Sequence, residues 1–120
     1  RNIKTVNKVL KIFFRKKNFS SLRTVTCMSE SSYKSLRIFN KKLCSIFNKD
    51  FDIDKFNKPK SSYPTTYVAN GILDIYLTKN ILKNTLLGKK SLAYITNEFN
   101  SDIDTRNDLE NVKIFLKMKQ

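Results

Sequence analysis

The most apolar run of the chain reads Tyr67-Val68-Ala69-Asn70-Gly71-Ile72-Leu73-Asp74-Ile75-Tyr76-Leu77. Its length and its β-branched and aromatic residues predict a buried strand. Asn70 and Gly71 are unexpected inside a strand, and a glycine there indicates a β-bulge or a place where a ligand approaches the backbone closely. We therefore expect a buried strand with an irregularity near its start.

Helical and strand patterns alternate on both sides of this run. Apolar residues at helical spacing predict an amphipathic helix over residues 3–17. Alternating β-rich segments predict strands over residues 22–28 and 91–96, and Thr78 is expected to cap a short helix that ends near Leu82. Gly88 is expected to close the following turn. This order of elements indicates an α/β fold with an inserted hairpin.

The inserted hairpin is predicted from two short alternating segments, Leu36–Phe39 and Leu43–Phe47, which flank the turn Asn40-Lys41-Lys42. A polar loop over residues 50–62 follows it. Aromatic and basic residues alternate here, as in proteins that bind single-stranded nucleic acid, but no RNP-type motif or zinc finger accompanies them. A hairpin of this kind is more often buried on one face, in its own core or against another subunit.

The composition restricts the function in two ways. The 120 residues form at most one domain, and their formal net charge of +14 favours an anionic partner such as a nucleic acid, a nucleotide, an acidic sugar or an anionic membrane surface. Codon bias could also explain the many lysines. The chain has no histidine and two cysteines, which excludes the usual zinc clusters and catalysis by Cys-His or Ser-His-Asp.

The cysteines and the hydropathy pattern also predict a location. Cys27 and Cys44 are expected to be small buried hydrophobes in a reducing compartment, which indicates a cytoplasmic protein. No apolar run approaches the length of a membrane span, and no signal peptide is visible. The chain begins with Arg1 and not with Met, which leaves two alternatives: a signal that has been removed, or a missing N-terminal part of a longer protein.

A cluster of acids follows the last predicted strand. Four of the ten carboxylates lie in residues 101–110, and extended backbone would place Asp102 and Asp104 on one side of the chain. Thr105 and Asp108 have the spacing of a capping box before a helix. Carboxylates between a strand and a helix suit Mg²⁺, which binds one or two of them together with phosphate oxygens. Alternatively, the acids only solvate a loop and favour the helix N-terminus.

Several of these features together resemble the C-terminal half of the acylneuraminate cytidylyltransferases, the CMP-sialic acid synthetases and their relatives. The resemblance spans nearly the whole chain, and its pieces are Ser21-Leu22-Arg23-Thr24-Val25, Ser32-Tyr33-Lys34, Lys58-Pro59-Lys60, Tyr67-Val68-Ala69-Asn70-Gly71 with Asp74-Ile75-Tyr76, and Asp102-Ile103-Asp104-Thr105 followed by Asp108-Leu109.

The resemblance implies a fold and a set of roles. The fold would be the C-terminal half of a Rossmann-like nucleotide-diphospho-sugar transferase, residues 1–120 forming one partial domain in which about residues 32–66 are a dimerisation arm. Asp102 and Asp104 would bind the Mg²⁺ that organises the triphosphate of CTP, with Asp104 the more direct, catalytic ligand. The substrate-binding residues would be Asn70 at the acidic nonulosonic sugar, Lys60 near the sugar or nucleotide, and Lys34 at the start of the arm.

The sequence also departs from the family. The glycine-rich loop that holds CTP has no counterpart here, so the chain is expected to be inactive alone. Ser61 and Val68 stand where relatives often have Gln and Arg, which leaves the acidic sugar undetermined. Two alternatives remain: a small basic nucleic-acid-binding protein, which the arm makes unlikely, and an inactive remnant of an enzyme.

Overall fold

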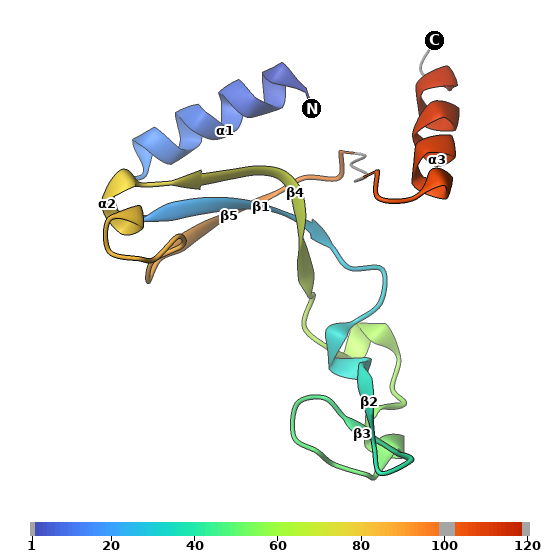
Figure 1. Cartoon of the computed structure of the whole chain (residues 1–120). Helices are drawn as coiled ribbons and strands as arrows, with labels where there is room; N and C mark the ends of the chain where they lie inside the picture. The colour runs from blue at the N-terminus through green and yellow to red at the C-terminus, as the bar shows by residue number, and fades with distance from the viewer. Residues whose placement is uncertain (1, 99–102, 119–120) are drawn as a thin grey trace.

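The computed structural model describes residues 2–98 and 103–118 of the chain, which form three helices and five strands (Figure 1). The helices are α1 (Ile3–Arg15), α2 (Thr78–Ile81) and α3 (Arg106–Lys117), and the strands are β1 (Ser21–Cys27), β2 (Leu36–Phe39), β3 (Lys42–Ser45), β4 (Tyr67–Tyr76) and β5 (Ser91–Ile95). Three 3₁₀ turns, η1 (Ser32–Lys34), η2 (Ile53–Phe56) and η3 (Lys60–Ser62), lie between β1 and β4. The expected mixture of α and β structure is therefore present.

A three-stranded mixed sheet in the order β4-β1-β5 forms the body of the molecule. The central strand β1 pairs antiparallel with β4 and parallel with β5. The parallel pair begins at Ser21 opposite Ser91 and continues to Val25 opposite Ile95. The carboxyl ends of β1 and β5 therefore lie at the same edge of the sheet.

The predicted irregularity in the apolar run is a large β-bulge. The β1–β4 register runs from Arg23 opposite Asp74 directly to Val25 opposite Ala69, so residues 70–73 lie across from the single residue Thr24. Gly71 lies within the bulge at a φ of +66°, a conformation that L residues with a side chain rarely adopt. The expectation of a buried strand is wrong for most of β4. Ile72 is buried, the residues after it are half-buried, and Tyr67 and Val68 at the start are about half exposed.

One face of the sheet is covered by α1 (Figure 1). Val9 and Phe13 of α1 meet Leu22 of β1, and these three buried residues form the core. Partly buried side chains complete it, namely Phe19, Leu73, Ile75, Leu77, Leu92 and Tyr94. The predicted helix is therefore present, although it ends at Arg15 instead of residue 17, and Ile3 and Phe14 of its apolar pattern are exposed.

The arm, residues 32–66, hangs away from this sheet as a separate two-stranded hairpin with short turns (Figure 1). Asn40 and Lys41 both have positive φ, as a two-residue type I′ turn requires, so the predicted three-residue turn is one residue too long and Lys42 already belongs to β3. The predicted loop over residues 50–62 contains η2 and η3.

Two smaller expectations were wrong. Thr78 is the first residue of α2 and does not cap it, because Leu77 occupies the N-cap position without a side-chain hydrogen bond. Cys44 is buried, but Cys27 is exposed, and both are free thiols. Within residues 2–98 and 103–118 no helix is both long and apolar enough to cross a membrane.

Candidate functional site

The candidate site lies at the edge of the sheet where the parallel strands β1 and β5 end. The Thr26 hydroxyl donates a 2.9 Å hydrogen bond to the carbonyl oxygen of Thr96, the residue after β5. The Asn70 side-chain amide in turn donates to Thr26 Oγ1 at 2.9 Å. In open α/β sheets ligands bind beyond the carboxyl ends of such strands, so this edge is the first place to expect a substrate.

Asn70 also holds the bulge in shape. Its Oδ1 accepts a 3.2 Å hydrogen bond from the backbone N–H of Ile72 and lies 2.7 Å from the hydroxyl of Thr24. The Thr24 hydroxyl, which is buried, accepts a 3.0 Å bond from the N–H of Leu73. Because these contacts satisfy backbone groups that the interrupted ladder leaves unpaired, Asn70 has a structural role in addition to any contact with a substrate.

Glu98 brings a carboxylate to the same edge. It follows β5 by three residues, its backbone N–H donates to Thr96 Oγ1 at 3.2 Å, and its side chain accepts a hydrogen bond from the hydroxyl of Thr5 in α1. The contact ties the first turns of α1 to the chain segment that leads toward the acidic cluster. Sequence reasoning did not single out Glu98.

The capping box predicted at the acidic cluster is present. Thr105 is the N-cap of α3, its backbone N–H donates to Asp108 Oδ2 at 2.8 Å, and the N–H of Asp108 donates back to Thr105 Oγ1 at 3.2 Å. Hydrogen bonds from the side chain and backbone of Thr105 lower the pKa of the Asp108 carboxyl. Asp108 is therefore used in capping the helix.

Asp104 is the residue of the predicted metal pair that the structure describes, and Asp102 lies outside the described residues. Asp104 is exposed and directly precedes the N-cap of α3, where the helix dipole favours negative charge. Within residues 2–98 and 103–118 no group of three or more Asp, Glu, Cys or His side chains is gathered closely enough to hold a metal. A Mg²⁺ ion bound mainly to phosphate oxygens needs fewer, so the exposed Asp104 carboxylate suits that role.

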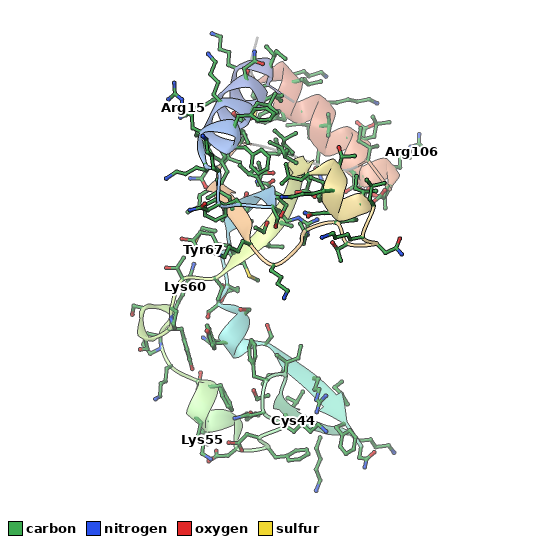
Figure 2. The ribbon with its side chains drawn as sticks, turned by 90° about the vertical axis from the view of Figure 1, so that its left-hand side faces the viewer. Arg15, Cys44, Lys55, Lys60, Tyr67 and Arg106 are labelled. Carbon is green, nitrogen blue, oxygen red and sulfur yellow. The ribbon has the colours of Figure 1, made fainter. Side chains whose placement is uncertain are left out.

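The two predicted substrate-binding lysines lie in the arm. Lys60 Nζ donates 2.8 Å hydrogen bonds to the carbonyl oxygens of Met28 and Ser29, directly after β1. Lys60 thus links the arm to the sheet, and Figure 2 shows it near Tyr67 at this junction. Lys34 ends η1 and lines a hollow of about 200 Å³ within the arm, together with Asp54 of η2. The structure therefore places Lys34 in the arm, whereas Asn70 lies in the sheet.

An ion pair that sequence reasoning missed crosses the other face of the sheet. Arg23 donates to both oxygens of Asp74, through Nε at 3.0 and 3.2 Å and through Nη2 at 2.8 Å, and the hydroxyl of Tyr76 donates to Asp74 at 2.9 Å. These bonds raise the pKa of Arg23 and lower that of Asp74. Alternation puts both residues opposite the α1 side, since their neighbours Leu22 and Ile75 belong to the core.

The comparisons with known proteins leave the family open. No protein-family model matches the sequence, and a search of curated proteins finds no match. The resemblance to the acylneuraminate cytidylyltransferases consequently depends on the motifs themselves.

Proposed function

We propose that the chain is part of a nucleotidyltransferase similar to the acylneuraminate cytidylyltransferases, which transfers CMP from CTP to a sialic-acid-like nonulosonic acid and releases pyrophosphate. The observation that carries the proposal is the polar network from Asn70 through Thr26 to Thr96 at the carboxyl end of the parallel pair. From this edge the chain runs on to Asp104 and the capped helix α3. The resemblance assigns roles in sugar and metal binding to these same segments.

In this proposal Asp104, with Asp102, would hold Mg²⁺. The bound ion would neutralise the charge that develops on the leaving pyrophosphate. Asp104 is suited to this because its carboxylate is exposed and because Asp108, the next acid in the described chain, is engaged by Thr105. Gly71, which has no side chain, allows the acidic sugar to approach the backbone beside Asn70.

The shape of the chain supports its being part of a larger assembly. Its radius of gyration is 18.4 Å, whereas a compact domain of this length has about 14 Å. Its accessible surface is 9737 Å², whereas a compact chain of this mass exposes about 6,700 Å². We infer that another part of the enzyme, with the CTP-binding loop, covers some of this surface and that the chain alone does not turn over CTP.

The arm is the surface that we assign to a homodimer. Its exposed apolar side chains include Ile38 at 75%, Phe47 at 60% and Phe39 at 55% exposure. Large apolar side chains that are exposed together in one arm are typical of a protein–protein interaction surface. Two copies of the arm, packed against each other, would bury it.

The protein is expected to be cytoplasmic, because the thiols of Cys27 and Cys44 are free.

Calorimetry on the sugar nucleotide tests the enzymatic proposal. The titrant is CMP-sialic acid with and without Mg²⁺, and the proteins are the wild type, Asp104→Asn and the matched control Asp54→Asn, which removes the same charge from an exposed acid of the arm. We expect Mg²⁺-dependent binding that Asp104→Asn weakens by about tenfold or more, equivalent to about 1.4 kcal/mol, and that the control leaves unchanged. Equal binding by all three proteins would contradict the assignment of Asp104.

The same samples test the nucleic-acid alternative. A single-stranded oligonucleotide that binds with a steep salt dependence, and ignores Asp104→Asn, would favour that alternative. The arm makes it less suitable, because the ring of Tyr33 already stacks on Phe47 and on Tyr63, with centroids 5.3 and 5.9 Å apart. Stacked against each other, these rings have less surface for bases.

A further inference from the structure

A hollow of about 240 Å³ lies at the end of the sheet opposite the candidate site, where β1 and β5 begin. It is lined by three separate segments of the chain, residues 17–20 between α1 and β1, Lys79 in α2, and Lys89 with Lys90 before β5. Figure 1 shows these segments gathered around α2 at one end of the molecule. From Ser20 to Thr26 the strand rises about 20 Å, which separates this hollow from the polar network around Asn70.

The charge of the hollow is of one sign. Four of its seven lining residues are lysines, Lys17, Lys79, Lys89 and Lys90, and none is an acid. In the described part of the chain, the ion pairs involve Arg23, Lys55 and Lys113 and none of these four. The high lysine content of the chain does not give every hollow this many lysines. A larger hollow of about 480 Å³ along α1 has two basic residues among its five lining residues. Like charges around one hollow repel each other, and an anion between them removes that repulsion.

The backbone beneath the lysines is held by a dense hydrogen-bond network. Ser20 and Lys90 exchange backbone and side-chain bonds, with Ser20 N–H donating to the Lys90 carbonyl at 2.8 Å and Lys90 N–H to Ser20 Oγ at 3.3 Å. The buried amide of Asn80 donates to the carbonyls of Ser20 at 2.8 Å and Leu86 at 3.3 Å. Gly88 completes the turn at a φ of +66°. The backbone segments that precede β1, form α2 and precede β5 are therefore fixed relative to one another.

We propose that this lysine hollow is a binding site for a small polyphosphate anion, separate from the candidate site. Lysine ammonium groups bind phosphate oxygens as point charges, and several of them match the several charges of a polyphosphate. The volume lies below the roughly 300 Å³ at which sites for drug-sized ligands begin, so the hollow suits a phosphate chain better than a whole nucleotide. The inference does not depend on the proposed enzymatic function, because it involves neither Asp104 nor Mg²⁺.

Titration with inorganic triphosphate in metal-free buffer tests the proposal. The variant Lys89→Gln/Lys90→Gln removes two charges from the hollow, and Lys41→Gln/Lys42→Gln removes two from the hairpin turn as the matched control. We expect saturable binding by the wild type, weakened about tenfold or more by the first variant and less than about twofold by the control.

Two further readouts keep the test decisive. Amide NMR shifts should move at Ser20 and Gly88 during the titration, and unfolding by urea should show that both double variants remain folded. Equal weakening in both double variants would reduce the effect to overall charge and overturn the proposal, as would an absence of saturation. Oligonucleotide binding that depends on Lys89 and Lys90, without triphosphate binding, would assign the hollow to nucleic-acid phosphates and also overturn it.

Discussion

The turn at Gly88 allows a stability prediction that can be worked directly from the structure. A Cβ added at Gly88 would lie 2.6 Å from Ser20 Oγ and 3.0 Å from Asn80 Nδ2, and the residue has a φ of +66°. A side chain in this left-handed region costs about 1–2 kcal/mol. Gly88→Ala would therefore introduce both backbone strain and a steric clash.

The clash carries its own cost because Ser20 Oγ is not free to move. It lies 2.9 Å from the carbonyl oxygens of Leu87 and Lys90, to which it can donate, and it accepts from the N–H of Lys90. Displacing it would lose one or two hydrogen bonds of about 1 kcal/mol each. Together with the strain, we expect Gly88→Ala to destabilise the chain by about 2–4 kcal/mol, a large part of the stability of a small domain.

Urea unfolding followed by far-UV circular dichroism measures this loss. A decrease of 2–4 kcal/mol corresponds to a midpoint lowered by about 1–3 M. Gly88→Asn separates the two causes, since asparagine tolerates positive φ but still has a Cβ, so it should cost about as much as the clash alone, about 1–2 kcal/mol. In a Ser20→Ala background the 2.6 Å contact is removed, but the 3.0 Å contacts with the Cβ of residue 20 and with Asn80 Nδ2 remain. The additional cost of Gly88→Ala should therefore be smaller than in the wild type but not below the strain of about 1–2 kcal/mol. A midpoint that Gly88→Ala leaves unchanged would refute the reasoning.

Three further predictions concern other contacts. Asp74→Asn should lower stability by about 1 kcal/mol near neutral pH, because its ion pair with Arg23 is partly exposed. Folding lowers the pKa of Asp74. The contribution of the ionised Asp74 to stability is therefore present above its unfolded-state pKa of about 3.9 and is lost as the pH falls from there through the folded-state pKa. Wild-type and mutant stabilities should converge in acid, and a difference that persists in acid would contradict this. Thr105→Ala should remove the capping box and destabilise α3 by about 1 kcal/mol. Amide hydrogen exchange should then be faster in Arg106–Lys117 and unchanged in the sheet. If exchange also accelerates in the sheet, α3 is more tightly coupled to the sheet than its exposure indicates. Lys60→Met should release the arm from the end of β1 and speed exchange in residues 32–66, whereas unchanged exchange there would show that the link through Lys60 is dispensable.

The sequence predicted the elements whose cause is local. The helical period of α1 and the spacing of Thr105 and Asp108 each depend on contacts within a few residues, and both predictions are confirmed. The pairing of Arg23 with Asp74 depends on the register between two strands, and that register is set by the bulge. Periodicity does not reveal how many residues a bulge contains, so this ion pair could not be placed from the sequence.

The candidate site was predictable to a similar degree. Gly71 indicated the irregularity in β4, but the partners of Asn70 come from β1, some 44 to 46 residues away in sequence. Lys60 carries a charge that could suit a substrate, and its use in binding the carbonyls after β1 becomes visible with the fold. The lysine hollow was missed because its members come from three segments that sequence spacing does not connect.

The pairing of buried polar groups in the sheet argues against a decayed remnant. Decay would leave unpaired polar groups throughout the interior, whereas Thr24 and Asn80, buried polar residues at the two ends of the sheet, have hydrogen-bond partners. Among the described residues, the buried side-chain polar atoms without a partner are Arg37 Nε and Tyr63 Oη. Both lie in the arm, which also exposes large apolar side chains. Because this chain already covers both atoms, a second copy does not reach them directly. The exposed apolar side chains of the arm are what the proposed homodimer would bury.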